Sequence, residues 1–180
     1  MQMRLIMLCG VIGSGKDFYS HEYARNHPNE RVEIIRFATP LRNICAKLYN
    51  FDANDEVAYE KFKAENRKIM VDLGQAMKDE MGLDIFAVAA GEKMWPRFKE
   101  NITFIIPDFR FPVEFGTMMD FFVPNVVFCN YHSDRYEINP EQVTEQMAIW
   151  LVEQGYQHGQ VFSALEFEKI MQKYQLNLVD

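Results

Sequence analysis

The sequence GVIGSGKD at positions 10–17 decides the fold, and it reads Gly10-Val11-Ile12-Gly13-Ser14-Gly15-Lys16-Asp17. An apolar run at 5–9 precedes it and predicts a buried strand, and the residues at 17–26 predict a helix. Glycines in the loop let the backbone turn with its N–H groups pointing inward, beside the positive end of that helix. This is the G-x-x-x-x-G-K pattern in the strand, loop and helix context that phosphate binding requires. We therefore interpret all eight residues as an ATP-binding loop; the alternative is an ordinary glycine-rich turn.

The last two residues of the loop carry charge. Lys16 places a mobile positive charge where the β- and γ-phosphates of ATP would lie. Asp17 stands where this pattern usually has Ser or Thr, whose hydroxyl binds Mg²⁺. A carboxylate is also a hard oxygen ligand, so Asp17 is a candidate magnesium ligand.

The composition predicts one domain that covers residues 1–180. A chain of 180 residues with 48% hydrophobic content can bury a sizeable core. No apolar run reaches membrane-spanning length, and the first predicted strand begins too early to leave room for a signal peptide. Cys9, Cys45 and Cys129 lie far apart in apolar surroundings, as reduced core thiols do. We therefore expect a cytoplasmic protein without a membrane partner.

The charge balance limits the partners. A net charge of −7 argues against an extended basic face and so against long nucleic acid. The four histidines show no metal-ligand spacing, so a zinc centre is not expected. A few local cations must bind any phosphate, and the expected partners are small-molecule nucleotides. Formation of a homodimer is left open.

Strands and helices alternate along the chain. Further strands are predicted at 32–38, 102–106, 126–129 and, weakly, 156–162. Helices are predicted at 39–49, 57–81, from 84 to about 96, 113–122, 141–154 and 165–174. This alternation predicts an α/β fold, namely the three-layer α/β/α arrangement of P-loop NTPases with a mainly parallel five-stranded sheet.

Local patterns add three expectations. Thr39 is predicted to cap the helix at 39–49, with Pro40 as its first helical residue. Asp84 is predicted to cap the helix that follows it. A buried stripe at helical spacing is predicted in 57–81, formed by Phe62, Ile69, Leu73 and Met77.

A second chemical site follows the strand at 102–106. Ligands of parallel sheets bind beyond the carboxyl ends of the strands, where Gly10, Asp108 and Asn130 fall. Asp108 can hold Mg²⁺ through water or accept a substrate hydrogen bond, and Arg110 offers a planar fork for phosphate oxygens. We predict Lys16, Asp108 and Arg110 as catalytic residues and Asp108 as a second metal candidate. The alternative is a local ion pair or a turn-stabilising aspartate.

Two more arginines are candidates for binding phosphate. Arg42 lies near the carboxyl end of the second strand and is a candidate for the acceptor phosphate, its alternative being a solvated helix residue. Arg135 lies in a polar segment at about 131–141 that we interpret as a lid, so Arg135 is a candidate for ATP; the alternative is an ordinary loop arginine. The segment at about 50–81 is expected to cover the acceptor. Phe62 or Phe86 could stack on a base, although core packing is favoured for both.

Several motifs, taken in order, resemble the bacteriophage deoxynucleoside monophosphate kinases. They are Lys16-Asp17, Phe37-Ala38-x-Pro40-Leu41, Arg67-Lys68 with Leu73-Gly74, Asp108-x-Arg110-Phe111-Pro112-x-Glu114, Thr144-Glu145 and Leu165-Glu166. The resemblance implies an adenylate-kinase-like P-loop fold and Mg²⁺-dependent transfer of a phosphoryl group from ATP to a deoxynucleoside monophosphate. It implies Arg67, Glu114 and Glu145 as acceptor-binding residues, beside Arg42 and Arg110, and the cytoplasm of a host if the source is viral.

Other interpretations remain open. Animal-type phosphomevalonate kinases share the lysine-aspartate loop ending and the Asp-x-Arg, and only Phe111-Pro112-x-Glu114 and Phe37-Ala38 favour the nucleotide kinases over them. Val71 replaces a usual glutamine, and Phe86 replaces a common tryptophan, so the accepted base is not fixed. A nucleotide-binding ATPase or switch without an acceptor site, or an inactive structural relative, would carry the same loop.

Overall fold

The computed structural model describes residues 4–97, 99–130 and 143–177. Five strands form one sheet: β1 (Arg4–Cys9), β2 (Arg31–Ile34), β3 (Ile102–Ile106), β4 (Asn125–Phe128) and β5 (Val161–Phe162). Their order across the sheet is β2-β3-β1-β4-β5. The first four are parallel to one another, and β5 pairs with β4 in the antiparallel sense. The predicted α/β fold with five strands is confirmed, and the sheet, predicted to be mainly parallel, is mixed but mostly parallel.

Seven α-helices are described in these residues. They are α1 (Lys16–Asn26), α2 (Thr39–Tyr49), α3 (Glu56–Met81), α4 (Ile85–Met94), α5 (Pro112–Phe121), α6 (Val143–Glu153) and α7 (Ala164–Asn177), and a short 3₁₀ turn, η1 (Trp95–Arg97), follows α4. In the described part of the chain, no helix is both long enough and apolar enough to span a bilayer.

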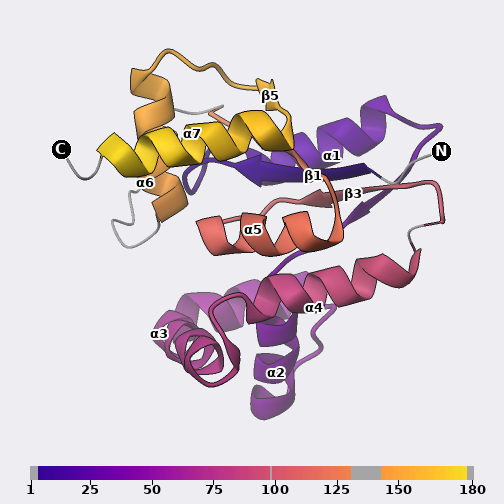
Figure 1. Cartoon of the computed structure of the whole chain (residues 1–180). Helices are drawn as coiled ribbons and strands as arrows, with labels where there is room; N and C mark the ends of the chain where they lie inside the picture. The colour runs from indigo at the N-terminus through magenta and orange to yellow at the C-terminus, as the bar shows by residue number, and fades with distance from the viewer. Residues whose placement is uncertain (1–3, 98, 131–142, 178–180) are drawn as a thin grey trace.

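Helices cover both faces of the sheet. Alternate residues of β1 point to opposite faces, because side chains along a strand have a period of two. Leu5 and Met7 belong to the larger core, which α4, α5, α6 and α7 close, whereas Ile6 and Leu8 belong to a smaller core beside Tyr19 and other residues of α1. Figure 1 shows the sheet between these layers. The expectation of three layers agrees with these two cores.

The reversed direction of β5 has a local cause. After α6 the chain turns through Gly155 and Gly159, both with positive φ. The Gly159 N–H donates to the Phe128 carbonyl at 2.8 Å, and the Asn130 N–H donates to His158 Nδ1 at 2.8 Å. The chain therefore reaches the carboxyl end of β4 before it enters β5, and β5 must run back along β4.

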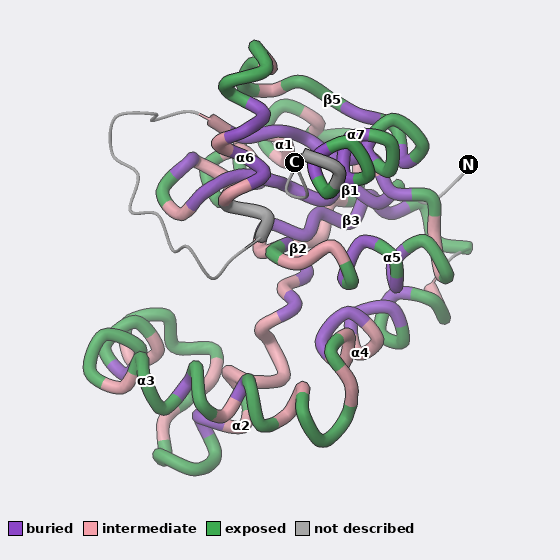
Figure 2. The backbone as a smooth tube through the Cα atoms, turned by 60° about the vertical axis from the view of Figure 1, so that its left-hand side comes forward, coloured by how far each residue is buried: buried purple, intermediate pink, exposed green. Residues whose placement is uncertain are grey.

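A kink in α3 makes part of the predicted stripe wrong. Asn66 has non-helical backbone angles, and its side-chain amide donates to the Phe62 carbonyl at 3.0 Å. This side-chain bond competes with the helical backbone bonds and shifts the phase of the residues that follow. Met70 is consequently buried with Phe62 in a separate cluster of α2 and α3, while Ile69 is 39% exposed. Figure 2 shows how much of α3 is exposed.

Both predicted caps differ from the structure. The N-cap of α2 is Ala38, so Thr39 is already helical. Asp84 occupies the N-cap position of α4 without capping its backbone, because its carboxylate accepts a hydrogen bond from the Thr117 hydroxyl at 2.9 Å. The strand β2 also ends earlier than predicted, since the chain leaves the sheet after Ile35 for the loop that leads into α2.

Candidate active site

The glycine-rich loop forms a closed turn at the carboxyl end of β1. Gly13 and Gly15 have φ of 79° and 87°, which glycine adopts without the steric cost that side chains incur. Lys16 folds back over the loop, and its Nζ donates to the carbonyls of Gly10 at 2.6 Å and Val11 at 2.7 Å. The ammonium group therefore lies at the loop, as the predicted phosphate site requires.

Gly10 fixes the loop to the neighbouring strand. A Cβ at Gly10 would lie 2.4 Å from the Cys129 carbonyl and 2.4 Å from Ser14 Oγ, so a side chain cannot fit there. The Cys129 N–H also donates to the Cys9 carbonyl at 2.8 Å. Ser14 is buried, and its hydroxyl has no hydrogen-bond partner among the described residues. The loop thus packs tightly against the end of β4, and the Ser14 hydroxyl points away from solvent.

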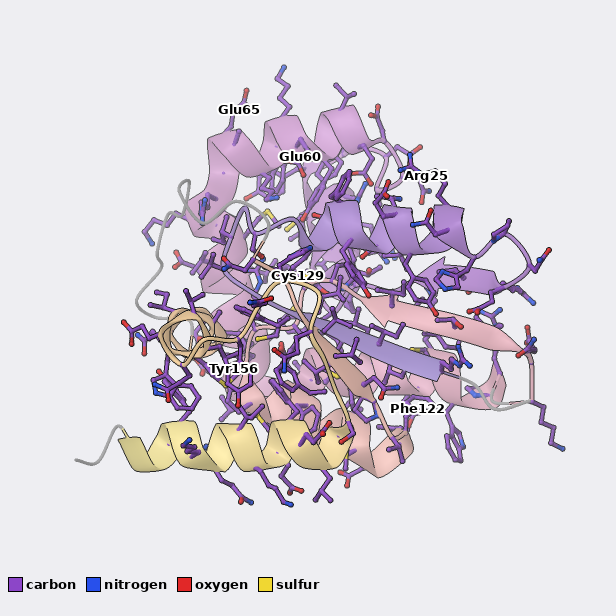
Figure 3. All side chains as sticks on the ribbon, turned by 90° about the horizontal axis from the view of Figure 1, so that it is seen from above. Arg25, Glu60, Glu65, Phe122, Cys129 and Tyr156 are labelled. Atoms are coloured by element: carbon purple, nitrogen blue, oxygen red, sulfur yellow. The ribbon has the colours of Figure 1, made fainter. Side chains whose placement is uncertain are left out.

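The cysteines behind the loop are core residues. All three are buried and unpaired, and burial raises the pKa of the Cys9 and Cys129 thiols to about 12. Figure 3 labels Cys129 in the interior of the molecule, in contrast to Glu60 and Glu65 on the exposed side of α3. A protonated buried thiol is a weak nucleophile, so Cys9 and Cys129 support the loop by packing.

Asp17 lies in the first turn of α1 and is exposed. Its Oδ1 accepts a hydrogen bond from Arg36 Nη2 at 2.7 Å. Arg36 follows β2 and was not among the sequence candidates. Burial lowers the pKa of Arg36, but the hydrogen bond and charge of Asp17, with the charges of Asp108 and Glu56, raise it more. Arg36 is therefore a firmly charged group beside the loop.

Asp108 joins two loops. Its two carboxylate oxygens accept the backbone N–H groups of Phe37 and Ala38, each at 2.9 Å. Burial raises the pKa of Asp108, and these two hydrogen bonds and the charges of Arg110 and Arg36 oppose that effect. Asp108 thus holds the β2–α2 loop against the end of β3, and its catalytic and metal-binding roles remain predictions.

Glu114 supports the backbone that carries Arg110. Its Oε2 accepts the N–H groups of Arg110 at 2.7 Å and Phe111 at 2.9 Å, which caps α5. Glu114 is only 4% exposed, and burial raises its pKa to about 7, against the effect of these hydrogen bonds. Arg110 itself is exposed. The predicted acceptor role of Glu114 remains a prediction, and in this structure its carboxylate positions the Arg110 loop.

Arg42 lies on α2 between an acidic and an aromatic partner from α3. Its Nη1 donates to Glu56 Oε1 at 2.8 Å, and its Cζ lies 4.1 Å from the centre of the Tyr59 ring. Its side chain is 13% exposed, so the solvated alternative does not describe it well. Arg42 is therefore held at the junction of α2 and α3, on the side of the β2–α2 loop.

The remaining candidates lie elsewhere or outside the described residues. Arg67 is an exposed residue of α3. Phe62 packs in the cluster of α2 and α3, and Phe86 packs in the main core, as the core-packing alternative expects. Glu145 belongs to α6, but its side chain is not described. Arg135 and the predicted lid at 131–141 lie outside the described residues.

Sequence reasoning missed Arg36 and Lys78. Arg36 lies inside a predicted strand, where alternation suggests an ordinary solvated residue. Lys78 lies on α3, its Nζ is 3.8 Å from the centre of the Phe111 ring, and burial lowers its pKa although the nearby Glu114 opposes this. Only the packing of α3 against the loop after β3 brings Lys78 beside Phe111 and Glu114, and no sequence signal marks it.

One carboxylate near the loop, that of Asp17, is suited to bind a magnesium ion. Among the described residues, no group of three or more His, Cys, Asp or Glu side chains could hold a metal ion. Asp17 nevertheless presents an exposed carboxylate in the first helical turn after the loop, and a bound Mg²⁺ keeps several waters and needs only one or two carboxylates beside substrate phosphates. Asp17 suits this role better than Asp108, whose oxygens already accept two backbone N–H groups.

This chain is similar to one protein family and to solved structures of other proteins. The family model described as phosphomevalonate kinase matches residues 8–124, which include the loop, Asp108, Arg110 and Glu114. Among solved structures, a mutant APS kinase from Mycobacterium tuberculosis shares 11% identity at a TM-score of 0.39, over 84% of this chain and 96% of that one. A chain of the Pnkp1/Rnl/Hen1 RNA repair complex shares 11% identity at a TM-score of 0.41, over 91% of this chain and 49% of that one. This chain therefore spans about half the length of the RNA repair chain. No curated protein matches the sequence.

The loop, the sheet and the family match together define a P-loop kinase-like protein. Because the family model covers more than half of the chain, the chain belongs to the phosphomevalonate kinase family. This membership supports an ATP-dependent small-molecule kinase.

Proposed function

We propose that this protein transfers the γ-phosphoryl group of ATP to the phosphate of a small phosphate monoester, with 5-phosphomevalonate as the favoured acceptor. The carrying observation is the family match over residues 8–124, which contains the phosphate loop and the Asp108-x-Arg110 motif in one segment. The product is a diphosphate, and ADP leaves.

Positioning and charge neutralisation supply most of the catalysis in phosphoryl transfer. The loop N–H groups and Lys16 bind the β- and γ-phosphates of ATP, and the phosphates replace the Gly10 and Val11 carbonyls as partners of the ammonium. Mg²⁺, when bound, neutralises charge on the phosphates, with Asp17 as its protein ligand. The acceptor phosphate is already an anion and needs no general base.

The acceptor phosphate lies beside the end of β3 in this proposal. Arg110 and Arg42 bind it, since a guanidinium group can contact two phosphate oxygens at once. Asp108 and Glu114 hold the backbones that carry these cations. The segment at about 50–81 covers the acceptor. Arg135, in the predicted lid at about 131–141, is proposed to bind ATP on the basis of the sequence alone.

A deoxynucleoside monophosphate is the second candidate acceptor. It is favoured by the Phe111-Pro112-x-Glu114 motif, whose glutamate accepts the N–H groups of Arg110 and Phe111. However, Phe62 and Phe86 are both buried among core residues, so neither offers a free ring face to a nucleobase. The two predicted stacking residues therefore give no support to a nucleobase in the acceptor.

The test is a coupled ADP-release assay with 5-phosphomevalonate and a panel of deoxynucleoside and ribonucleoside monophosphates. We expect turnover that requires an added monoester, with Lys16→Met as the inactive control. Equal ATP turnover with and without every monoester would overturn the proposal in favour of an ATPase or switch. Absence of ATP binding would indicate an inactive relative. The proposal also retains small-molecule partners, without long nucleic acid or membrane, and a cytoplasmic setting.

A further inference from the structure

Cations from three parts of the chain gather around Asp108. Arg36 follows β2 and Arg110 follows β3, and both charges lie near enough to influence the Asp108 carboxylate. Arg42 joins them through Tyr59, whose ring lies under the Arg42 guanidinium and also lies near Asp108. The whole chain has a net charge of −7, so these arginines form a local positive region in an otherwise acidic protein.

Asp108 fixes the backbone directly after Arg36. Its carboxylate accepts the N–H groups of Phe37 and Ala38, the two residues that follow Arg36. The same pair of hydrogen bonds sets the start of α2, which carries Arg42. One carboxylate from the end of β3 therefore determines where both Arg36 and Arg42 are presented.

A phosphate could replace the Asp17 carboxylate as the partner of the Arg36 guanidinium group. Its contact with Asp17 is a single hydrogen bond from Nη2 at 2.7 Å, and both side chains are accessible, Arg36 at 39% and Asp17 at 66%. Exposed ion pairs of this kind contribute little stability, so exchanging the partner costs little. A phosphate monoester could accept two N–H groups from the same fork and gain more.

We propose that Arg36 is a further acceptor-phosphate residue, which Asp17 holds at the edge of the phosphate loop until the acceptor binds. This inference rests on the proposed function. When Arg36 turns to the acceptor, the Asp17 carboxylate beside the loop loses its cation and becomes available on the donor side. Binding of the acceptor and preparation of the donor site are thereby coupled through one ion pair.

The test is a double-mutant cycle in direct binding, without nucleotide or metal. Isothermal titration with 5-phosphomevalonate, and with deoxythymidine monophosphate in parallel, is applied to Arg36→Gln, Asp17→Asn and the double variant. We expect Arg36→Gln to weaken acceptor binding about tenfold or more, since a charge-assisted hydrogen bond is lost. Asp17→Asn should strengthen binding several-fold, roughly as the removal of a weak competing ion pair predicts. In the Arg36→Gln background, that gain should disappear.

The matched control is Arg31→Gln at the other end of the same strand. Arg31 pairs with Glu100 and Glu33 and is also exposed, so its loss removes the same charge away from the site. Acceptor binding by Arg31→Gln should equal that of the wild type. Thermal melting of every variant confirms folding, and Arg36→Lys, which keeps the charge without the fork, should bind with intermediate affinity.

Two results would overturn the inference while the proposed function stands. One is that Arg36→Gln binds the acceptor with wild-type affinity. The other is that Asp17→Asn still strengthens binding to the same extent in the Arg36→Gln background, because the Asp17 charge would then act on the acceptor directly and not through Arg36. Failure of the wild-type protein to bind either acceptor would overturn the inference together with the proposed function.

Discussion

At the scale of single residues, Lys16 holds the carbonyls of Gly10 and Val11 within its own loop. Its charge should matter most in the transition state, because the bridging and γ-oxygens gain charge as the bond breaks. Lys16→Met should therefore reduce kcat by about 100-fold or more, in the range of one lost electrostatic contact, and weaken ATP binding far less. Steady-state kinetics with calorimetric ATP binding measures both. Near-normal turnover would remove Lys16 from the mechanism.

Arg110 is the residue that we propose distinguishes an acceptor-using kinase from an ATP binder. Its backbone is fixed by Glu114, and its side chain is exposed beside Asp108. Arg110→Lys keeps the charge and loses the planar fork, so the KM for the acceptor should rise strongly while the KM for ATP stays nearly unchanged. Measuring both constants tests this, and a defect confined to ATP would place Arg110 on the donor side.

Glu114 makes stability depend on pH. Its pKa is raised from 4.5 to about 7, so the folded state binds more protons than the unfolded state between these values. The free energy of unfolding should therefore fall as pH rises from 4.5 to 7, by up to about 3 kcal/mol for this one group. Glu114→Gln should keep both backbone hydrogen bonds through its amide oxygen and flatten this slope, as denaturant unfolding at several pH values would show.

Glu166 provides the matched control for Glu114. It also accepts a backbone N–H at the start of a helix, from Ser163 at 2.7 Å, but it is exposed, and this hydrogen bond lowers its pKa. Glu166→Gln should leave the slope between pH 4.5 and 7 in place. An equal slope in wild type and Glu114→Gln would show that Glu114 is not the responsible group.

At the scale of elements, α4 and α5 approach each other closely at Gly91. A Cβ there would lie 2.6 Å from Phe121 Cε2, and the Phe121 ring is itself packed near Trp95 and Phe122. Gly91→Ala should lower the free energy of unfolding by roughly 1–3 kcal/mol, as overpacking does. Denaturant unfolding measures the change.

Gly116 on α5 is the control for Gly91. No atom lies within 4 Å of a Cβ at this position, so Gly116→Ala adds only helix propensity and should stabilise by about 0.5–1 kcal/mol. If Gly91→Ala and Gly116→Ala changed the free energy of unfolding equally, contact between α4 and α5 would not be the cause of the change at Gly91.

The elements also show how far the sequence can predict this fold. Strong local patterns predicted three elements correctly. Glycine spacing predicted the loop, an apolar run predicted the buried strand β3, and a proline near the helix start helped to predict the bounds of α2. The stripe in α3 failed because the Asn66 side chain breaks the helical phase, which periodicity cannot detect. The direction of β5 could not be predicted because it depends on where the turn after α6 meets β4.

The sequence could suggest only some of the residues of the candidate site. Lys16, Asp17, Asp108 and Arg110 could be chosen because each lies at the carboxyl end of a predicted strand. Arg36 could not, since its proposed role depends on its contact with Asp17, which is 19 residues away in the chain and 2.7 Å away in space. Likewise, the hydrogen bonds of Asp108 and Glu114 to backbone N–H groups are visible only once the loops are placed.

At the scale of the whole molecule, the carboxyl ends of two neighbouring strands carry the two halves of the proposed site. β1 ends in the loop that we propose binds ATP, and β3, its neighbour in the sheet, ends in Asp108 and Arg110. Asp108 holds the loop that leads into α2, and α2 and α3 contribute Arg42 and Tyr59. Transfer between two phosphates is the chemistry that such neighbouring sites permit.

Phosphorus NMR tests this central claim most directly. The protein is incubated with MgATP and 5-phosphomevalonate, and in parallel with each deoxynucleoside monophosphate, and the spectra are followed over time. We predict that the monoester signal of the accepted substrate is replaced by the two coupled signals of a diphosphate, in equal amount to the ADP formed and without inorganic phosphate. Release of inorganic phosphate with every monoester signal unchanged would contradict the account, because the γ-phosphoryl group would then have passed to water.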